Sequence, residues 1–106
     1  QIWYLDLFAG KNDHEAVQRA GESGHKEINR TNLSTDQIAE GLKKDVVQKQ
    51  LALIRMRNTH KAFSEGAEVA ISGGERSLEI RWEYNSAFAT LYVNFESGTY
   101  TIVESR

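Results

Sequence analysis

The chain opens on an almost continuous apolar run, IWYLDLF, from Ile2 to Phe8, which only Asp6 interrupts. Runs of this kind are typical of strands buried on both faces, as in parallel sheets that helices cover on each side. The pattern therefore predicts a buried strand. Asp6 has two interpretations: it lies close to water at the strand's C-terminal end, or it is a site carboxylate, because α/β proteins place their chemistry at the C-terminal ends of parallel strands.

A short helix is predicted after this run. Asn12 or Asp13 can cap it, and Gly21 can end it. The residues from Gly21 to Asn32 are expected to form a loop. A connection as long as Phe8 to Leu33 is uncommon in a compact domain and is usually either functional or disordered. Because this one carries its own helical turn signals, we interpret it as ordered and functional.

Two further helices are predicted in the middle of the chain. The motif Ser34-x-x-Gln37 is a capping box, in which the Ser and Gln side chains each bond a free backbone N–H of the first turn. The longest helix is expected from about Asp45 to His60, where apolar residues recur at helical spacing. The stripe that it would pack on a sheet contains Val47, Leu51 and Ile54.

From Ala67 onward the period of the apolar positions changes to two, which indicates strands. Turn residues at Gly73-Gly74, Asn85-Ser86 and Gly98 divide this part into four short strands, so we expect an antiparallel meander with one buried face. The composition shifts near Ser64 to Gly66. We therefore place a domain boundary there, with residues 1–62 in one domain and residues 63–106 in a small antiparallel β domain.

Composition and charge exclude several classes of protein. The 106 residues are 40% hydrophobic and 26% charged, as in a globular chain. A net charge of −2 argues against a nucleic-acid or acidic-membrane partner, which would need a basic surface. The chain has no Cys, hence no disulfide framework, and no apolar run approaches the ~20 residues that span a bilayer. Because a natural domain rarely opens inside an apolar strand, we expect a piece of a longer protein.

The candidate chemistry lies in the long connection. The three His residues lack the spacings of a metal site, so no metal and no cofactor are expected. Lys26, Asn29 and Arg30 lie on one short loop that is flanked by glycine. Two cations and a carboxamide on such a loop suit an anion or a polyhydroxylated ligand. The alternative is a structural cluster of ion pairs with Glu27 and Asp13 as partners. Which of the two applies is left open by the residues alone.

Three motifs resemble a known enzyme family. The stretches IWYLDLFAGKNDHEAV, KEINRTNLST and VVQKQLALIRMRNTHKAF are collinear with the pattern VYYVGLLAGKND, GRDINRHYYS, PVVQ and LIRFRNTHPAF of sucrose phosphorylases and their relatives in glycoside hydrolase family 13. The match covers about Ile2 to Phe63, in the C-terminal portion of those enzymes. Beyond Phe63 the resemblance is one of kind only, since the family also ends in a small antiparallel β domain.

The resemblance implies a fold and an activity. Residues 2–8 would be the eighth strand of a (β/α)8 barrel, residues 8–33 the loop that follows it, and Asp45 to His60 the eighth helix, giving an α+β fragment made of the last βα unit and a β domain. The parent enzyme would transfer a glucosyl group from an α-glucoside such as sucrose to phosphate with retention, which needs two carboxylates. In the family these carboxylates lie on earlier strands, so the fragment alone is expected to be inactive.

The resemblance also assigns candidate site residues. In sucrose phosphorylases, the first Arg of the motif R-D-I-N-R reaches the site where fructose leaves and phosphate enters. In this chain Lys26 takes the place of that Arg, and His25 beside it resembles a one-residue insertion. Lys26 and His25 are therefore the substrate-binding candidates. Asn29, Arg30 and Asp13 are expected to hold the loop in shape. A Lys offers a point charge in place of a bidentate fork, so a different acceptor or hydrolysis stays open.

A rival interpretation comes from another class of protein. The β segment could be a non-catalytic module that binds carbohydrate or a protein, with Trp82 and Tyr84 as a stacking platform, although their alternation with charged residues fits the buried face of a sheet better. The partners implied for the parent enzyme are a small sugar and phosphate. We further expect a cytoplasmic location and a homodimer through exposed strand edges.

Overall fold

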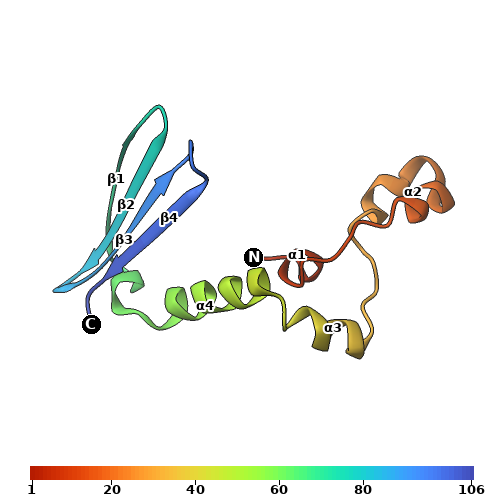
Figure 1. The fold of residues 1–106 in the computed structure, drawn as a ribbon, viewed down its shortest axis with the longest axis horizontal. Coiled ribbons are helices and arrows are strands. Elements are labelled where there is room, and N and C mark those ends of the chain that lie inside the picture. The colour runs from red at the N-terminus through yellow and green to blue at the C-terminus, as the bar shows by residue number, and fades with distance from the viewer. The chain divides into compact units, whose positions relative to one another are not determined.

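The structure is a computed structural model that describes residues 1–106, apart from the side chain of Ser23 (Figure 1). It divides into two compact units, Gln1–Ile54 and Arg55–Arg106, each of which is described by itself. The first unit is helical and the second contains a four-stranded antiparallel sheet. The predicted α+β class with such a sheet is therefore confirmed. No helix among the described residues has both the length and the apolar character needed to cross a bilayer.

The opening run is not a strand, so that prediction is wrong. Its centre forms one helical turn, α1 (Tyr4–Leu7), preceded by extended backbone at Trp3, with φ −74° and ψ 142°. The strands of the described chain all belong to the sheet of the second unit, so this run has no neighbouring strand to pair with. A helical turn bonds the same backbone groups locally. Asp6, with its two interpretations, lies exposed in α1, whereas Leu5 is fully buried.

The turn ends in a Schellman motif. The Gly10 N–H donates to the Leu5 carbonyl at 2.8 Å, and the Ala9 N–H donates to the Asp6 carbonyl at 3.1 Å. Ala9 takes the left-handed position with φ 48°. Glycine usually occupies this position, because a left-handed conformation costs other residues about 1 kcal/mol or more. Ala9, the second residue after α1, is thus held in a strained conformation.

The other helices that the sequence predicts are present, whereas the loop expected from Gly21 to Asn32 is helical at its start. Helix α2 (His14–Ala20) is capped by the Asp13 side chain and stops at Gly21, where φ is 68°. A 3₁₀ helix, η1 (Gly21–Glu27), occupies the start of the expected loop. The capping box of Ser34 and Gln37 starts α3 (Thr35–Gly41) with both of its hydrogen bonds present, and α4 runs over Asp45–Thr59. The predicted long helix and the capping box are confirmed.

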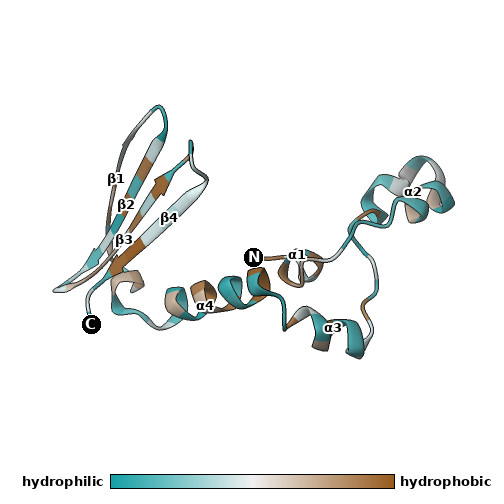
Figure 2. Ribbon diagram, in the orientation of Figure 1, coloured by the Kyte–Doolittle hydropathy of each residue, from teal (hydrophilic) through white to brown (hydrophobic). Residues whose placement is uncertain are grey.

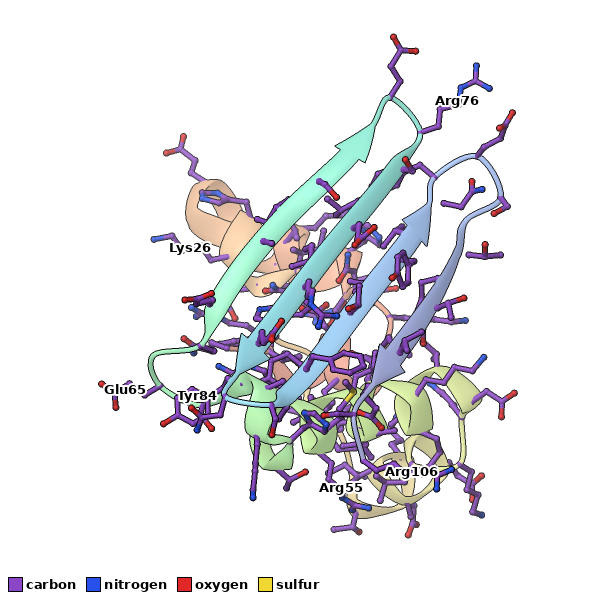
Figure 3. The ribbon with its side chains drawn as sticks, turned by 90° about the vertical axis from the view of Figure 1, so that its left-hand side faces the viewer. Lys26, Arg55, Glu65, Arg76, Tyr84 and Arg106 are labelled. Carbon is purple, nitrogen blue, oxygen red and sulfur yellow. The ribbon has the colours of Figure 1, made fainter. Side chains whose placement is uncertain are left out.

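The sheet of the second unit is a meander in the order β1-β2-β3-β4 (Figure 3). Its strands are β1 (Glu68–Gly74), β2 (Ser77–Tyr84), β3 (Ala87–Asn94) and β4 (Thr99–Glu104). All neighbours pair antiparallel, and the register places Ile80 opposite both Ile71 and Leu91. Hydrophobic and hydrophilic positions alternate along β2 and β3 (Figure 2), so one face of the sheet is predominantly apolar. The predicted burial of this face is wrong at β1, which is exposed throughout.

A short 3₁₀ helix, η2 (Lys61–Phe63), packs on one end of the sheet. Ala62 and Ala89 are fully buried there, and the ring of Phe63 lies 5.3 Å from the ring of Trp82. Trp82 is half-buried. The predicted division at residues 62 and 63, which concerned the parent enzyme's domains, stays a prediction.

Both ring nitrogens of His60 have partners at this end of the sheet. Nδ1 accepts from the Ala62 N–H at 3.2 Å, and Nε2 lies 2.9 Å from the Ser105 carbonyl. A neutral ring with its proton on Nε2 satisfies both contacts, because Nδ1 must then be an acceptor and Nε2 a donor. His60 therefore joins η2 to the end of the chain.

Candidate anion-binding site

A pocket of about 340 Å³ lies at the loop that carries the candidate residues. Helix η1 places His25 and Lys26 on it, and the residue that caps α1, Trp3, forms another part of its wall. We call this the loop pocket. Its lining residues are Trp3, His25, Lys26, Ile28, Asn29 and Arg30.

Positive charge dominates the loop pocket. The Arg30 guanidinium is paired with Glu27, at 3.0 Å between Nη1 and Oε1. Lys26 takes part in none of the ion pairs found among the described residues, and its side chain is exposed, extending outward in Figure 3. His25 is exposed beside it. The pocket can therefore receive an anion without first breaking an ion pair of Lys26.

Hydrogen bonds to backbone carbonyls close the loop around the pocket. The Trp3 indole N–H donates to the Asn29 carbonyl at 2.8 Å, and the Tyr4 hydroxyl donates to the Thr31 carbonyl at 2.5 Å. The Asp13 N–H donates to the Ile28 carbonyl at 2.7 Å. The apolar pattern of the opening run predicts a buried strand and gives no indication of these roles. The signal present was the polar tips of two adjacent aromatic residues, which usually find a hydrogen-bond partner when partly buried.

Asp13 does not join the predicted ion-pair cluster with Lys26 and Arg30. Its Oδ1 accepts from the Ala16 N–H at 2.9 Å, and its Oδ2 pairs with Arg19 at 3.1 Å. The hydrogen bond from the Ala16 N–H is the largest cause that holds the pKa of Asp13 below its ordinary value. Desolvation opposes this hydrogen bond, and the Arg19 charge lowers the pKa further. Asp13 thus fixes the start of α2, whereas Glu27 is the carboxylate that pairs with Arg30.

The lowered pKa predicts a pH-dependent contribution to stability. Because the folded-state pKa of Asp13 lies below its unfolded value, its charge stabilises the folded state above the unfolded value, and this contribution is lost as the pH falls through the folded pKa. Asp13→Asn retains a good capping side chain without the charge. We expect it to lower the melting temperature at neutral pH and to match the wild type below the folded pKa, as measured by circular dichroism. Equal melting temperatures at neutral pH would contradict this.

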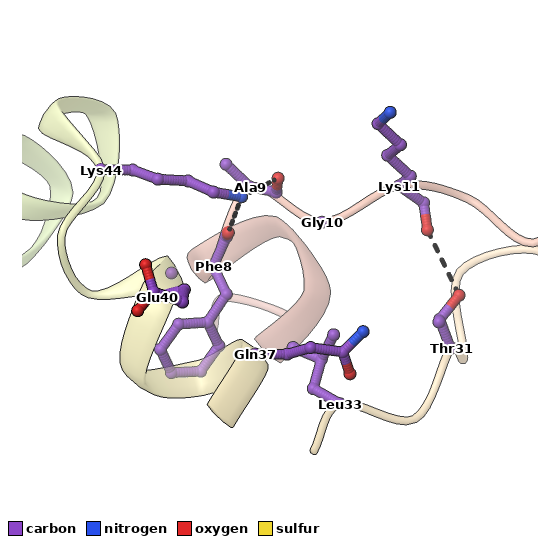
Figure 4. Close-up of a pocket in the computed structure, with 10 residues that line it drawn as sticks. Phe8, Ala9, Gly10, Lys11, Thr31, Leu33, Gln37, Glu40 and Lys44 are labelled. Carbon is purple, nitrogen blue, oxygen red and sulfur yellow. Dashed lines mark hydrogen bonds between the residues drawn. The ribbon is translucent and has the colours of Figure 1, made fainter. Parts of the chain in front are cut away.

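A second pocket, of about 350 Å³, lies between the end of α1 and α3 (Figure 4). The Lys44 ammonium donates to the Phe8 carbonyl at 3.1 Å and to the Ala9 carbonyl at 2.9 Å. Thr31 Oγ1 donates to the Lys11 carbonyl at 3.2 Å. No local pattern in the sequence marks Lys44, because its partners lie 35 and 36 residues away. We call this the clamp pocket; it is lined by Phe8, Ala9, Gly10, Lys11, Thr31, Leu33, Gln37, Glu40, Gly41 and Lys44.

The loop pocket offers groups that can bind a ligand. The residues described as lining it carry cationic, amide, aromatic and apolar groups but no carboxylate. Among the residues that the structure describes, no three His, Asp or Glu side chains gather as metal ligands would. An anion or a hydroxylated ligand matches this set of groups, because Lys, Arg and His⁺ donate charge-assisted hydrogen bonds to phosphate.

Comparison with known proteins identifies the relatives of the chain. No family model matches it. It is 48% identical to a sucrose 6(F)-phosphate phosphorylase of Ilumatobacter coccineus over 102 residues, which are 96% of this chain and 19% of that protein. A sucrose phosphorylase of Agrobacterium vitis is 37% identical over 99% of the chain and 21% of its own length. The crystal structure of sucrose 6F-phosphate phosphorylase from Thermoanaerobacter thermosaccharolyticum superposes with a TM-score of 0.88 and 34% identity, over 100% of this chain and 21% of that one.

The chain is related to the sucrose phosphorylases. The resemblance recognised in the sequence is thereby confirmed, and it extends over the β segment, where the motifs showed only a likeness of kind. The chain matches the C-terminal part of its sucrose phosphorylase relatives and spans about a fifth of their length. The roles of Lys26, His25, Asn29, Arg30 and Asp13 stay predictions.

Proposed function

We propose that this chain is the acceptor-side portion of a sucrose-phosphorylase-like enzyme that transfers a glucosyl group from an α-glucoside to phosphate, yielding glucose 1-phosphate. The observation that carries the proposal is the loop pocket, in which Lys26 and His25 are exposed while Arg30 is paired with Glu27. The names of the relatives, two sucrose-type phosphorylases among them, support the reaction class.

In the proposed reaction the glucosyl group is first taken up by a carboxylate nucleophile, while a second carboxylic acid protonates the leaving oxygen. Phosphate then attacks the glucosyl-enzyme and the nucleophile is released, with retention of configuration. We place both carboxylates outside these 106 residues, so the chain alone is expected to be inactive. Lys26 would bind phosphate or the leaving sugar electrostatically, as a flexible point charge.

We also propose that the first unit completes a (β/α)8 barrel of glycoside hydrolase family 13 in the whole protein. Only the extended residues up to Trp3 would belong to the barrel's last strand, since α1 begins at Tyr4. The connection from Phe8 to Leu33 would then lie at the C-terminal face, where such barrels place their sites.

A second candidate function is phosphorolysis of an α-glucoside whose leaving sugar itself carries a phosphate. Identity is 48% to a sucrose 6(F)-phosphate phosphorylase and 37% to a sucrose phosphorylase. The adjacent His25 and Lys26 side chains both offer N–H donors, which also suit a second phosphate group. Comparison of turnover on sucrose and on phosphorylated sucrose by the full-length protein decides between the two candidates.

The test of the proposed function is Lys26→Ala in the full-length protein. Loss of one charge-assisted contact is expected to raise the KM for phosphate, or for a phosphorylated donor, by about tenfold or more. The measurement is the steady-state rate as a function of each ligand concentration. Lys49→Ala is the matched control, since Lys49 is exposed on α4 and lies outside the lining of the loop pocket. Unchanged dependence on both ligands in Lys26→Ala would remove the proposal.

A further inference from the structure

The loop that carries the candidate site begins in a strained conformation. Ala9 has φ 48°, in the left-handed region that residues with a side chain rarely adopt. Such a conformation persists where the surrounding structure determines it strongly, and such residues cluster at functional sites. The groups that hold Ala9 in this conformation therefore bear on the candidate site.

Two sets of contacts hold this turn. Within the turn, the Ala9 and Gly10 N–H groups complete the Schellman motif with Asp6 and Leu5. From outside it, Lys44 uses two ammonium protons on the Phe8 and Ala9 carbonyls, at 3.1 and 2.9 Å (Figure 4). These carbonyls lie at a helix C-terminus, where backbone acceptors lack intrahelical partners and a cation is favourable.

A second side chain from α4 acts on the same turn. The Gln50 Nε2 group lies 3.3 Å from the Asp6 carbonyl and 3.4 Å from the Leu7 carbonyl. These contacts are longer than those of Lys44. Four consecutive carbonyls at the end of α1, from Asp6 to Ala9, are thus met by two side chains that lie more than thirty residues further along the chain.

The position of this turn determines part of the loop pocket. The same turn carries Trp3 and Tyr4 at its start, and their polar tips hold the Asn29 and Thr31 carbonyls. Trp3 and Asn29 both line the loop pocket beside Lys26, whereas Lys44 does not line it. A shift of the turn would move one wall of the pocket relative to Lys26.

We propose that Lys44 is a positioning residue for the loop pocket. Its ammonium holds the two carbonyls at which the loop begins, keeps Ala9 left-handed and so fixes Trp3 and Asn29 against Lys26. The effect on ligand binding rests on the proposed function, in which the loop pocket receives the acceptor. The effect on Ala9 and Gly10 is independent of it.

The first arm of the test is amide hydrogen exchange in the 106-residue chain. Lys44→Met should accelerate exchange of the Ala9 and Gly10 N–H groups by about tenfold, because a charged donor is lost from their turn. Lys43→Met is the matched control, since Lys43 pairs only with Glu40 in the described chain and is exposed. Two variants should restore protection: Lys44→Arg, which keeps the cation, and Ala9→Gly combined with Lys44→Met, because glycine accepts the left-handed conformation.

The second arm is kinetic and uses the full-length protein. Lys44→Met should raise the KM for phosphate or phosphorylated donor several-fold with kcat little changed, and Lys44→Arg should restore it. Exchange equal to that of the wild type in Lys44→Met overturns the proposal, whatever the enzyme does. Faster exchange with an unchanged KM overturns the positioning role. If Lys26→Ala leaves the dependence of the rate on both ligands unchanged, the proposed function fails. A higher KM in Lys44→Met would then still support the positioning role, for a ligand that other residues of the pocket bind.

Discussion

Phe63→Ala is expected to destabilise the second unit by about 3 kcal/mol, the range seen when a large aromatic side chain is removed from a packed site. The Phe63 ring joins three groups of this unit. It lies 5.3 Å from the Trp82 ring and 6.1 Å from the His60 ring, and the Arg57 guanidinium stands 5.4 Å above it. Its loss uncovers the end of the sheet where Ala62 and Ala89 are buried.

The measurement uses Trp82 fluorescence in urea, in a Trp3→Phe background so that the signal reports the second unit alone. Phe95→Ala is the matched control, because Phe95 is 60% exposed and the same atoms are removed. We expect the control to change the free energy of unfolding by less than about 1 kcal/mol, as is usual for exposed positions. Equal effects of the two substitutions would show that Phe63 does not form the core of this unit.

Gly10→Ala is expected to destabilise the first unit by about 2 kcal/mol. A Cβ at this position would collide with Leu5 Cδ1 and stand 3.0 Å from Leu5 Cγ and 3.3 Å from the Leu5 carbonyl oxygen. Leu5 is fully buried, so its side chain cannot move aside without disturbing its surroundings. The Gly10 N–H bond to the Leu5 carbonyl, which completes the turn, would lengthen as well.

Trp3 fluorescence in a Trp82→Phe background reports this change, because Trp3 belongs to the first unit and lies next to α1. Gly74→Ala serves as the control and is measured through Trp82 in a Trp3→Phe background, because Gly74 belongs to the second unit; a Cβ there would lie 3.7 Å from Ser77 Oγ, an ordinary contact. In the full-length protein, Gly10→Ala should also weaken binding at the loop pocket. A stable Gly10→Ala variant would show that the close approach of Gly10 to Leu5 is not required.

Local signals in the sequence predicted the elements that local interactions decide. The capping box of Ser34 and Gln37 and the helix from Asp45 depend on neighbours three and four residues away, so their patterns are visible in a short window. The meander depends on alternation and on turn residues such as Asn85, whose φ of 55° suits Asn. Each of these features was read correctly because no distant residue competes with it.

The opening run is an element that local sequence patterns do not decide. A continuous apolar stretch such as Ile2 to Phe8 can be a strand or a buried helical turn, and neighbouring strands decide between them. Ala9 gave no signal of a helix stop, because the usual marker at that position is glycine. The 3₁₀ helix η1 carries no distinctive period, so its sequence predicts a loop.

The candidate site was located by family motifs, and its supports were not. Lys26 and His25 were placed in one pocket by the resemblance and by their adjacency in the chain. The contacts that shape this pocket connect Trp3 with Asn29, and Lys44 with Phe8 and Ala9, across 26 to 36 residues. Contacts between residues so far apart in the sequence depend on tertiary packing, so no local spacing pattern predicts them.

The topology of the sheet has a consequence for how quickly the second unit can assemble. Each strand pairs only with the strand next to it in the chain, in the order β1-β2-β3-β4. Each successive hairpin closes a short loop, so the entropy lost before the first stabilising pairs form is small. Hairpins form in roughly 1–10 μs, and domains dominated by local contacts fold fastest. The sheet is therefore expected to complete its folding one hairpin at a time, far ahead of any barrel that must bring together strands distant in sequence.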